Sequence, residues 1–433
     1  MKKIFLLLLM FAGTANSQYW VEQVSGVTTQ LYTVSGSAGS NAVWTAGESG
    51  VILRTTNGGT NWLPANTGIP PAALIYNIWA VDANTAIAAG MNGTTSNIWR
   101  TSNGGASWQV VLSQSNGFFN CIAMKSSNPL HGLVQGDPVG GRWSIWKTSN
   151  GGMNWDSTGC YLPQNATEAG WNNSIYIGSQ NFPSGNDSLI WFGTNNTRIY
   201  YSSNFGTTWN VQSTAPEANS YVVHFHAYFG PGDGLSGGAT LMRTSNLGVN
   251  WTSQASVGSG NFNGLVMFPA PVDYGYCWYT RQGSSIIYRG MNGANWAAEY
   301  TAPAGTYNHF INVRNGSTCF GVRSNGGITR CNYYLSSVNQ VSGEVPESFL
   351  LSQNYPNPFN PTTNFEFRIA DFGLVRLTVF DVIGREIEVL VNQQLQPGTY
   401  EVSWDASAYP SGVYYYRLEA GLFSETKKMV LIK

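Results

Sequence analysis

The sequence predicts an all-β protein with two domains, and three observations lead to this prediction. A short phrase rich in Asn and Gly recurs along the chain as far as residue 296. No segment holds apolar residues at the i, i+3, i+4, i+7 spacing of an amphipathic helix. After Cys331 the composition changes to a polar linker and then to a proline-containing segment. The 433 residues therefore divide into a repeat domain and a smaller C-terminal domain.

The repeated phrase predicts β-hairpins. In the copy from Arg100 to Trp108, an extended apolar approach leads into Ser-Asn-Gly-Gly and then a Trp. Asn and Gly accept the positive φ that tight turns require, so the Asn lies in the turn. We expect the Trp to pack as a plug against the next hairpin. The turn and plug residues of the copies are Asn57 and Trp62, Asn103 and Trp108, Asn150 and Trp155, Asn204 and Trp209, Asn246 and Trp251, and Asn292 and Trp296.

These residues resemble the Asp-box, or bacterial-neuraminidase, repeat, whose pattern is Ser/Thr-x-Asp-x-Gly-x-Thr/Ser-Trp. Asn stands here where the family usually has Asp. In that family the box joins the two outer strands of a β-propeller blade. The plug Trp residues are about 47 residues apart, close to one four-stranded blade per repeat. The resemblance implies a propeller of about seven blades over residues 19–335. The members of this family have different functions, so the resemblance leaves the function open.

The two ends of the repeat domain complement each other. Tyr19–Val24 looks like the segment that follows a box, yet no box precedes it. Residues 307–334 contain three strand-like runs and lack a fourth. We therefore expect the strand at Trp20 to complete the last blade and to close the ring, which removes an exposed sheet edge.

The start of the chain has the three parts of a secretory signal peptide over residues 1–17. Lys2 and Lys3 form its positive end, Ile4–Ala12 its apolar core, and Ala15–Ser17 a cleavage site of small residues. No later segment is apolar for long enough to cross a bilayer as a helix, so we expect no transmembrane span.

The C-terminal domain follows a polar linker at residues 336–349. Alternating strand-like runs over residues 350–433 predict a small, immunoglobulin-like sandwich of two sheets. These residues resemble the type A C-terminal sorting domain of the type IX (Por) secretion system. The matching segments are Asn354–Pro361, Val379–Gly384, Ser411–Tyr416 and Lys427–Lys433.

The sorting-domain resemblance implies a Bacteroidetes- or Chlorobi-like source and the type IX machinery as a partner. It also implies passage through the periplasm and across the outer membrane, ending in secretion or attachment at the cell surface. The resemblance leaves open whether the sorting domain is cleaved off or retained.

Polar residues outside the boxes are the candidates for a site, because propellers bind ligands where loops meet the axis. Asp137 lies in a Gly-Asp-Pro turn, and Arg142 could either pair with it or hold an anionic ligand. Glu168, expected to be exposed beside Trp171, is a candidate for a sugar site. Asp137 and Glu168 are the catalytic candidates. A turn Asp and solvated charges are the plainer interpretation of these residues.

Two histidines and the cysteines provide no predicted metal site. His224 and His226 alternate along one strand and share a face, near Asp233, and are candidate ligand-binding residues. Three metal ligands are not established, and we predict no metal and no cofactor. Cys319 and Cys331 flank a Ser-Asn-Gly-Gly turn almost symmetrically. A cross-strand disulfide and two buried thiols both remain open.

Composition and motifs narrow the function. Charged residues are 10% of the chain and the net charge is −1, which argues against nucleic-acid binding. The favoured hypothesis is a monomeric, exported binding module for polysaccharide or an extracellular protein. The alternative is a glycoside hydrolase, which needs a pair of carboxylates at the bond. A scaffold resembling the photosystem-assembly propellers is a third hypothesis. The sialidase Arg-Ile-Pro motif is absent from the sequence.

Overall fold

The computed structural model describes residues 20–37, 41–178, 187–225, 232–267, 276–291, 293–313, 318–332, 339–406 and 409–433. These residues form two compact units, of which the first is Trp20–Tyr333. Within the described residues, no helix is long and apolar enough to cross a membrane.

The first three blades of the first unit follow one another along the chain. Blade one contains β2 (Leu31–Gly36), β3 (Val43–Gly47), η1 (Glu48–Gly50), β4 (Ile52–Thr55) and β5 (Leu63–Pro64). Blade two contains β6 (Leu74–Ala80), β7 (Ala86–Asn92), β8 (Thr95–Thr101) and β9 (Gln109–Ser115). Blade three contains β10 (Phe119–Met124), β11 (Gly132–Val139) and β12 (Arg142–Thr148), and two isolated bridges extend it at Pro163 and Asp156.

The next three blades repeat the same antiparallel order. Blade four contains β13 (Gly170–Ile177), β14 (Ile190–Thr194), β15 (Arg198–Ser202) and β16 (Asn210–Ser213). Blade five contains β17 (Val222–Phe225), β18 (Gly234–Gly237), β19 (Leu241–Thr244) and β20 (Thr252–Gln254). Blade six contains β21 (Phe262–Met267), β22 (Tyr276–Arg281), β23 (Ile286–Met291) and β24 (Ala294–Thr301).

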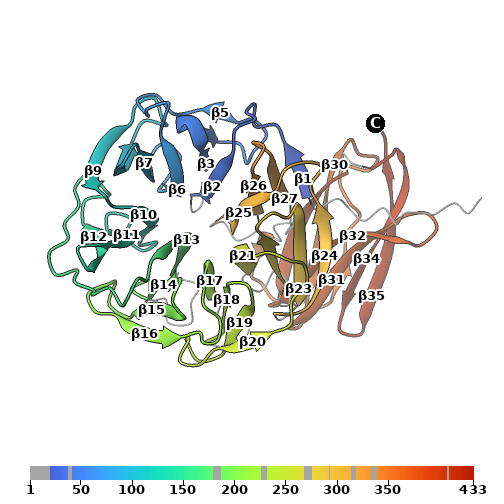
Figure 1. Ribbon diagram of the computed structural model, residues 1–433. Helices are drawn as coiled ribbons and strands as arrows, with labels where there is room; N and C mark the ends of the chain where they lie inside the picture. The colour runs from blue at the N-terminus through green and yellow to red at the C-terminus, as the bar shows by residue number, and fades with distance from the viewer. Residues whose placement is uncertain are drawn as a thin grey trace, which may run out of the picture. The chain divides into compact units, whose positions relative to one another are not determined.

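Blade seven joins the two ends of the first unit. It contains β25 (Tyr307–Asn312), β26 (Thr318–Arg323) and β27 (Ile328–Asn332), and β1 (Trp20–Gln23) pairs with β27 as its outer strand. Figure 1 shows the blades around a central axis, with β2, β6, β10, β13, β17, β21 and β25 innermost. The all-β, seven-bladed propeller predicted from the sequence is therefore confirmed.

The repeated turns are held by their own side chains. Thr101 Oγ1 donates to Asn103 Oδ1 over 2.9 Å and accepts from Gly105 N over 3.1 Å, and Ser107 N donates to Asn103 Oδ1 over 3.0 Å. Gly105 has a φ of +86°, and a Cβ there would meet Ala65 O at 2.3 Å. The turns at Asn57, Asn150, Asn204 and Asn246 form the same hydrogen bonds. Asn292 lies outside the described residues.

The plug Trp residues join neighbouring blades. Trp108 is buried, its ring meets Trp44 of β3 edge-on at 5.9 Å, and its Nε1 donates to Ala65 O over 2.7 Å. Trp62 meets Phe320 of β26 in the same way. In both cases the partner belongs to the preceding blade, so the expected packing against the next hairpin is wrong in direction. In the ring, the sheet that lies beside the Trp of each of these two turns is that of the preceding blade.

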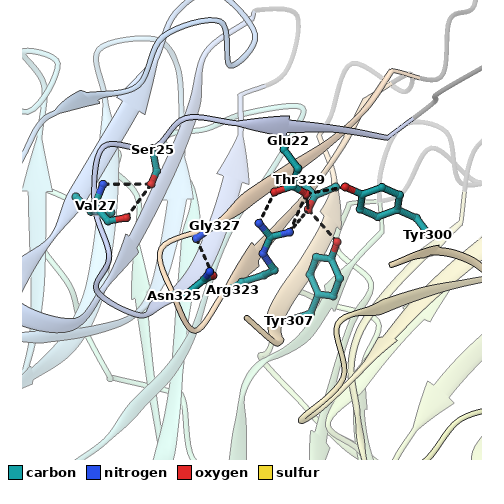
Figure 2. Close-up of polar contacts among 9 residues, drawn as sticks. All are labelled: Glu22, Ser25, Val27, Tyr300, Tyr307, Arg323, Asn325, Gly327 and Thr329. Atoms are coloured by element: carbon teal, nitrogen blue, oxygen red, sulfur yellow. Dashed lines mark hydrogen bonds and ion pairs between the residues drawn. The ribbon is translucent and has the colours of Figure 1, made fainter. Parts of the chain in front are cut away.

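A half-buried polar cluster holds β1 in blade seven (Figure 2). Glu22 forms an ion pair with Arg323 of β26 and accepts from Thr329 Oγ1 over 2.7 Å. It also accepts from Tyr300 Oη of blade six over 3.0 Å. Arg323 is buried, and its Nη1 also donates to Thr329. These bonds lower the pKa of Glu22, although burial acts in the opposite direction.

The second unit is a sandwich of two four-stranded sheets. Its alternating strands bury one set of side chains between the sheets, among them Phe365, Val379, Trp404 and Leu418. One sheet contains β28 (Asn339–Ser342), β33 (Gly398–Asp405), β30 (Thr362–Ile369) and β29 (Leu350–Leu351). The other contains β32 (Glu386–Leu395), β31 (Gly373–Phe380), β34 (Gly412–Ala420) and β35 (Phe423–Leu431).

Replacing Trp108 with Ala should destabilise the propeller by about 3–5 kcal/mol, because a large buried ring and its hydrogen bond are lost. Urea unfolding would measure this change. Leu63→Ala, at an exposed position beside the equivalent Trp62, is the control and should unfold like the parent. An unchanged unfolding midpoint for Trp108→Ala would contradict the plug role.

Replacing Glu22 with Gln should cost about 1–3 kcal/mol at pH 7, because Arg323 stays buried without its counter-charge. The folded-state pKa of Glu22 lies below its ordinary value of 4.5, so its contribution is present above that pH and is lost as pH falls through the folded pKa. Unfolding free energies of parent and variant should therefore converge in acid. Glu347→Gln removes an exposed carboxylate as a control, and a gap that stayed constant with pH would contradict the assignment.

Candidate functional site

Polar side chains of the inner strands connect the blades along the axis. Asn77 Oδ1 of β6 accepts from Ile122 N of β10 over 3.1 Å. His309 Nδ1 of β25 accepts from Val34 N of β2 over 3.2 Å. Burial lowers the pKa of His309 to about 3, so the imidazole stays neutral and keeps its accepting nitrogen. These bonds satisfy backbone donors that would otherwise be buried without partners.

Asn173 crosses the axis from blade four. It has a φ of +63° and lies where the pairing of β13 with β14 is irregular. Its Oδ1 accepts from Asn77 Nδ2 over 2.6 Å and from Thr33 Oγ1 over 3.2 Å, on the inner strands of blades two and one. Protein atoms therefore cross the axis at this level, and a ligand at this end would lie on the face of the ring.

Aromatic side chains of blades one to five form an aromatic rim at this end of the axis. Tyr32 and Tyr76 stack with ring centroids 5.0 Å apart, and Tyr76 and Phe118 follow at 5.1 Å. Trp171 and Tyr221 continue the rim on blades four and five at 4.2 Å. All five side chains are half-buried, so each keeps part of its surface open to solvent.

β-Bulges aim two of these side chains. The pairing of β2 with β3 passes from Leu31 to Thr33 and leaves Tyr32 as the extra residue. The pairing of β6 with β7 does the same at Tyr76. An extra residue is left out of the ladder, and the bulge re-aims its side chain. The bulges therefore explain why aromatic side chains gather at the start of the inner strands.

The rim lies on the face opposite the repeated turns. The four strands of a blade alternate in direction, so the start of the first strand and the turn before the fourth lie at opposite ends. The connection from the second to the third strand shares the rim's face. In blade one this connection includes Glu48 of η1, whose Oε1 accepts from Tyr32 Oη over 2.8 Å. Burial and Glu48 raise the pKa values of Tyr32 and Tyr76, so both phenols remain neutral.

Glu168 differs from its prediction. It was expected to be exposed, but only 1% of it is accessible. Its Oε1 accepts from Trp143 Nε1 over 3.1 Å, from Asn165 N over 3.0 Å and from Tyr200 Oη. Three donors from separate segments converge on this carboxylate and draw it into the protein, where a sugar cannot reach it.

Asp137 supports the rim. Its Oδ1 accepts from Asn120 Nδ2 over 2.9 Å and from Gly170 N over 2.8 Å, and its own N donates to Phe118 O over 2.8 Å. It thereby joins the backbone beside Phe118 to the backbone beside Trp171. Burial raises its pKa, which the bond from Gly170 partly offsets. Arg142 is exposed, and the expected pairing with Asp137 is replaced by these neutral donors.

Two members of the predicted cluster, His224 and Asp233, contact residues of other strands. His224 packs against Tyr176 with ring centroids 4.9 Å apart, and Asp233 pairs with Arg243 at 3.5 Å. His226 lies outside the described residues. In the part of the chain that is described, no group of three His, Cys, Asp or Glu side chains could hold a metal ion.

Four of the five rim residues were missed by sequence reasoning, which singled out only Trp171. A signal was present, because Tyr32-Thr33 and Tyr76-Asn77 each place an aromatic residue before a polar one at the start of an inner strand. Their meeting depends on the ring, which brings together strands about 45 residues apart.

The comparison with protein families decides the nature of the second unit. Residues 353–433 match the family described as secretion system C-terminal sorting domain. The chain carries a type IX sorting domain. This domain indicates export, with the protein secreted or held at the cell surface, and it implies contact with the secretion machinery. A search of curated proteins finds no match.

Solved structures similar to the chain are propellers. YCF48 from Cyanidioschyzon merolae has a TM-score of 0.51 at 15% identity, covering 72% of this chain and 98% of that one. YCF48 bound to D1 peptide has a TM-score of 0.54 at 16% identity, with 72% and 96% covered. The GH74 enzyme of Niastella koreensis has a TM-score of 0.55 at 12% identity, covering 81% of this chain and 59% of the enzyme. At these identities the likeness concerns the fold.

Deleting residues 346–433 should leave the protein in the periplasm, because the sorting domain is removed while the propeller keeps its own core. Fractionation of the producing cells and immunoblotting would measure this. Deletion of residues 1–17 is the contrasting control and should leave the chain in the cytoplasm. Normal export of the C-terminally truncated chain would contradict the sorting role.

Proposed function

We propose that this exported protein is a non-catalytic binding module that holds a polysaccharide against the aromatic rim. The rim carries the proposal, because five half-buried aromatic side chains share one face around the axis. Flat aromatic faces pack against the C–H faces of sugar rings, and the phenol groups add hydrogen bonds. A polymer of sugars would contact several rim residues at once.

The state of nearby carboxylates supports binding over hydrolysis. A glycosidase needs two carboxyl groups that flank the scissile bond. Glu48 accepts from Tyr32, Asp137 accepts from Asn120 and Gly170, and Glu168 is buried with three donors. Each of these groups is thus engaged in holding the protein's own structure.

The glycoside hydrolase alternative rests on Asp137. Its raised pKa suits a general acid, and the GH74 enzyme shares the propeller fold. An extracellular protein ligand is the other candidate, because a rim of aromatic residues also suits a protein interface. YCF48 bound to D1 peptide is an example of a peptide complex on this fold.

One assay separates these functions. The full mature chain is mixed with soluble and insoluble polysaccharides, and both loss of protein from solution and release of reducing ends are measured. Depletion without release supports the binding module. Release would replace it with the hydrolase, and Asp137→Asn would then be expected to abolish the release. If no polysaccharide causes depletion or release, this result would contradict a polysaccharide ligand.

Rim variants test the location of the site. Tyr76→Ala and Trp171→Ala should each weaken binding roughly tenfold, which corresponds to about 1.4 kcal/mol of lost stacking. Tyr161→Ala is the matched control, because Tyr161 is 67% exposed and is not a rim residue. Thermal unfolding of each variant would establish that the fold is kept. Equal affinities for all three variants would contradict the rim as the binding surface.

A further inference from the structure

Two buried thiols face each other in the blade that closes the ring. Cys319 of β26 and Cys331 of β27 are directly opposite in the antiparallel register, and both are fully buried. Burial, and then the neighbouring Cys331 side chain, raise the pKa of the Cys319 thiol, so it stays protonated. All five cysteines are free thiols in the structure.

The other three thiols have different partners. Cys121 Sγ donates to Trp171 O over 3.5 Å, Cys160 Sγ to Thr158 O over 3.7 Å, and Cys277 Sγ to Gly290 O over 3.6 Å. Each of these is a thiol against a backbone carbonyl. Only the pair in blade seven, among these cysteines, places sulfur opposite sulfur.

Backbone geometry already suits a bond between them. Directly opposite residues of an antiparallel pair have Cα atoms about 4.5–5.5 Å apart. Disulfides span Cα separations of about 4.4–6.8 Å. Little backbone movement is therefore needed to bring the two sulfur atoms into bonding distance.

We propose that Cys319 and Cys331 form a disulfide in the exported protein. The sorting domain routes the chain through the periplasm, where disulfides form and persist. The two thiols lose two protons and two electrons as the sulfur–sulfur bond forms. The oxidant is the disulfide of a periplasmic thiol oxidoreductase, which is reduced to a dithiol through a mixed disulfide.

The disulfide stabilises the part of the ring on which β1 docks. The loop it closes contains Arg323 and Thr329, the partners of Glu22 in Figure 2. Cys331 itself pairs with Trp20 of β1. Because both sulfur atoms are buried once the blade is complete, the exchange takes place before β1 covers β27. Oxidation of the β26–β27 hairpin thus precedes closure of the ring.

The test uses the full chain exported by its own cells, quenched with acid and labelled with a maleimide in denaturant without reductant. Of five cysteines, two are in the bond, so three thiols (5 − 2 = 3) should be labelled. Trypsin should release residues 315–323 linked to the peptide that begins at Cys331, and reductant should separate the two peptides. Five labelled thiols, or a link between other cysteines, would overturn the proposal.

Variants give a matched comparison. In Cys319→Ser the remaining four cysteines (5 − 1 = 4) should all be labelled, so the count rises although a cysteine is lost. Cys277→Ser, at another buried position, should leave the linked peptide intact. Reductant should lower the Tm of the parent by about 5 °C and leave that of Cys319→Ser unchanged. An equal response to reductant in both proteins would overturn the role in ring closure.

Discussion

The pairing of β1 with β27 is the interaction on which the propeller depends. Without it, β27 would present a free edge, and the faces of blades one and seven would lose the covering that a closed ring provides. The strand is held by its ladder, by the ion pair of Glu22 with buried Arg323, and by Trp20 Nε1, which donates to Glu299 Oε1 over 3.0 Å. Residues about 300 positions apart therefore make one sheet.

Closure of the ring also creates the candidate site. Seven inner strands can converge on one axis only when the circle is complete, and their polar side chains then bond blade to blade. Asn173 crosses the axis, while the bulges at Tyr32 and Tyr76 turn aromatic side chains onto the face. The same constraint that stabilises the fold thus yields an aromatic surface, which is a suitable place for a polymer of sugars.

Export and stability are connected in this protein through its C-terminal unit. The sorting domain sends the chain through an oxidising compartment, and the closing blade is the one with two cysteines in register. The bond of Asn77 with the backbone of Ile122 joins inner strands without charge, whereas the Glu22–Arg323 ion pair lies at the outer strand β1. A chain with few charges thereby places one of its ion pairs at the point where the ring is completed.

The sequence by itself determined the features that depend on short stretches of chain. The Asn of each repeated turn forms hydrogen bonds within four residues of itself, and the sorting domain is a continuous segment. Both can therefore be predicted from the sequence. Only the tertiary structure decided what lies at the axis. Tyr32, Tyr76 and Phe118 come from different blades, and Glu168 is buried because Trp143 and Tyr200 reach it from other strands. Burial and contact depend on neighbours that are distant along the chain, and local turn chemistry does not encode where they meet.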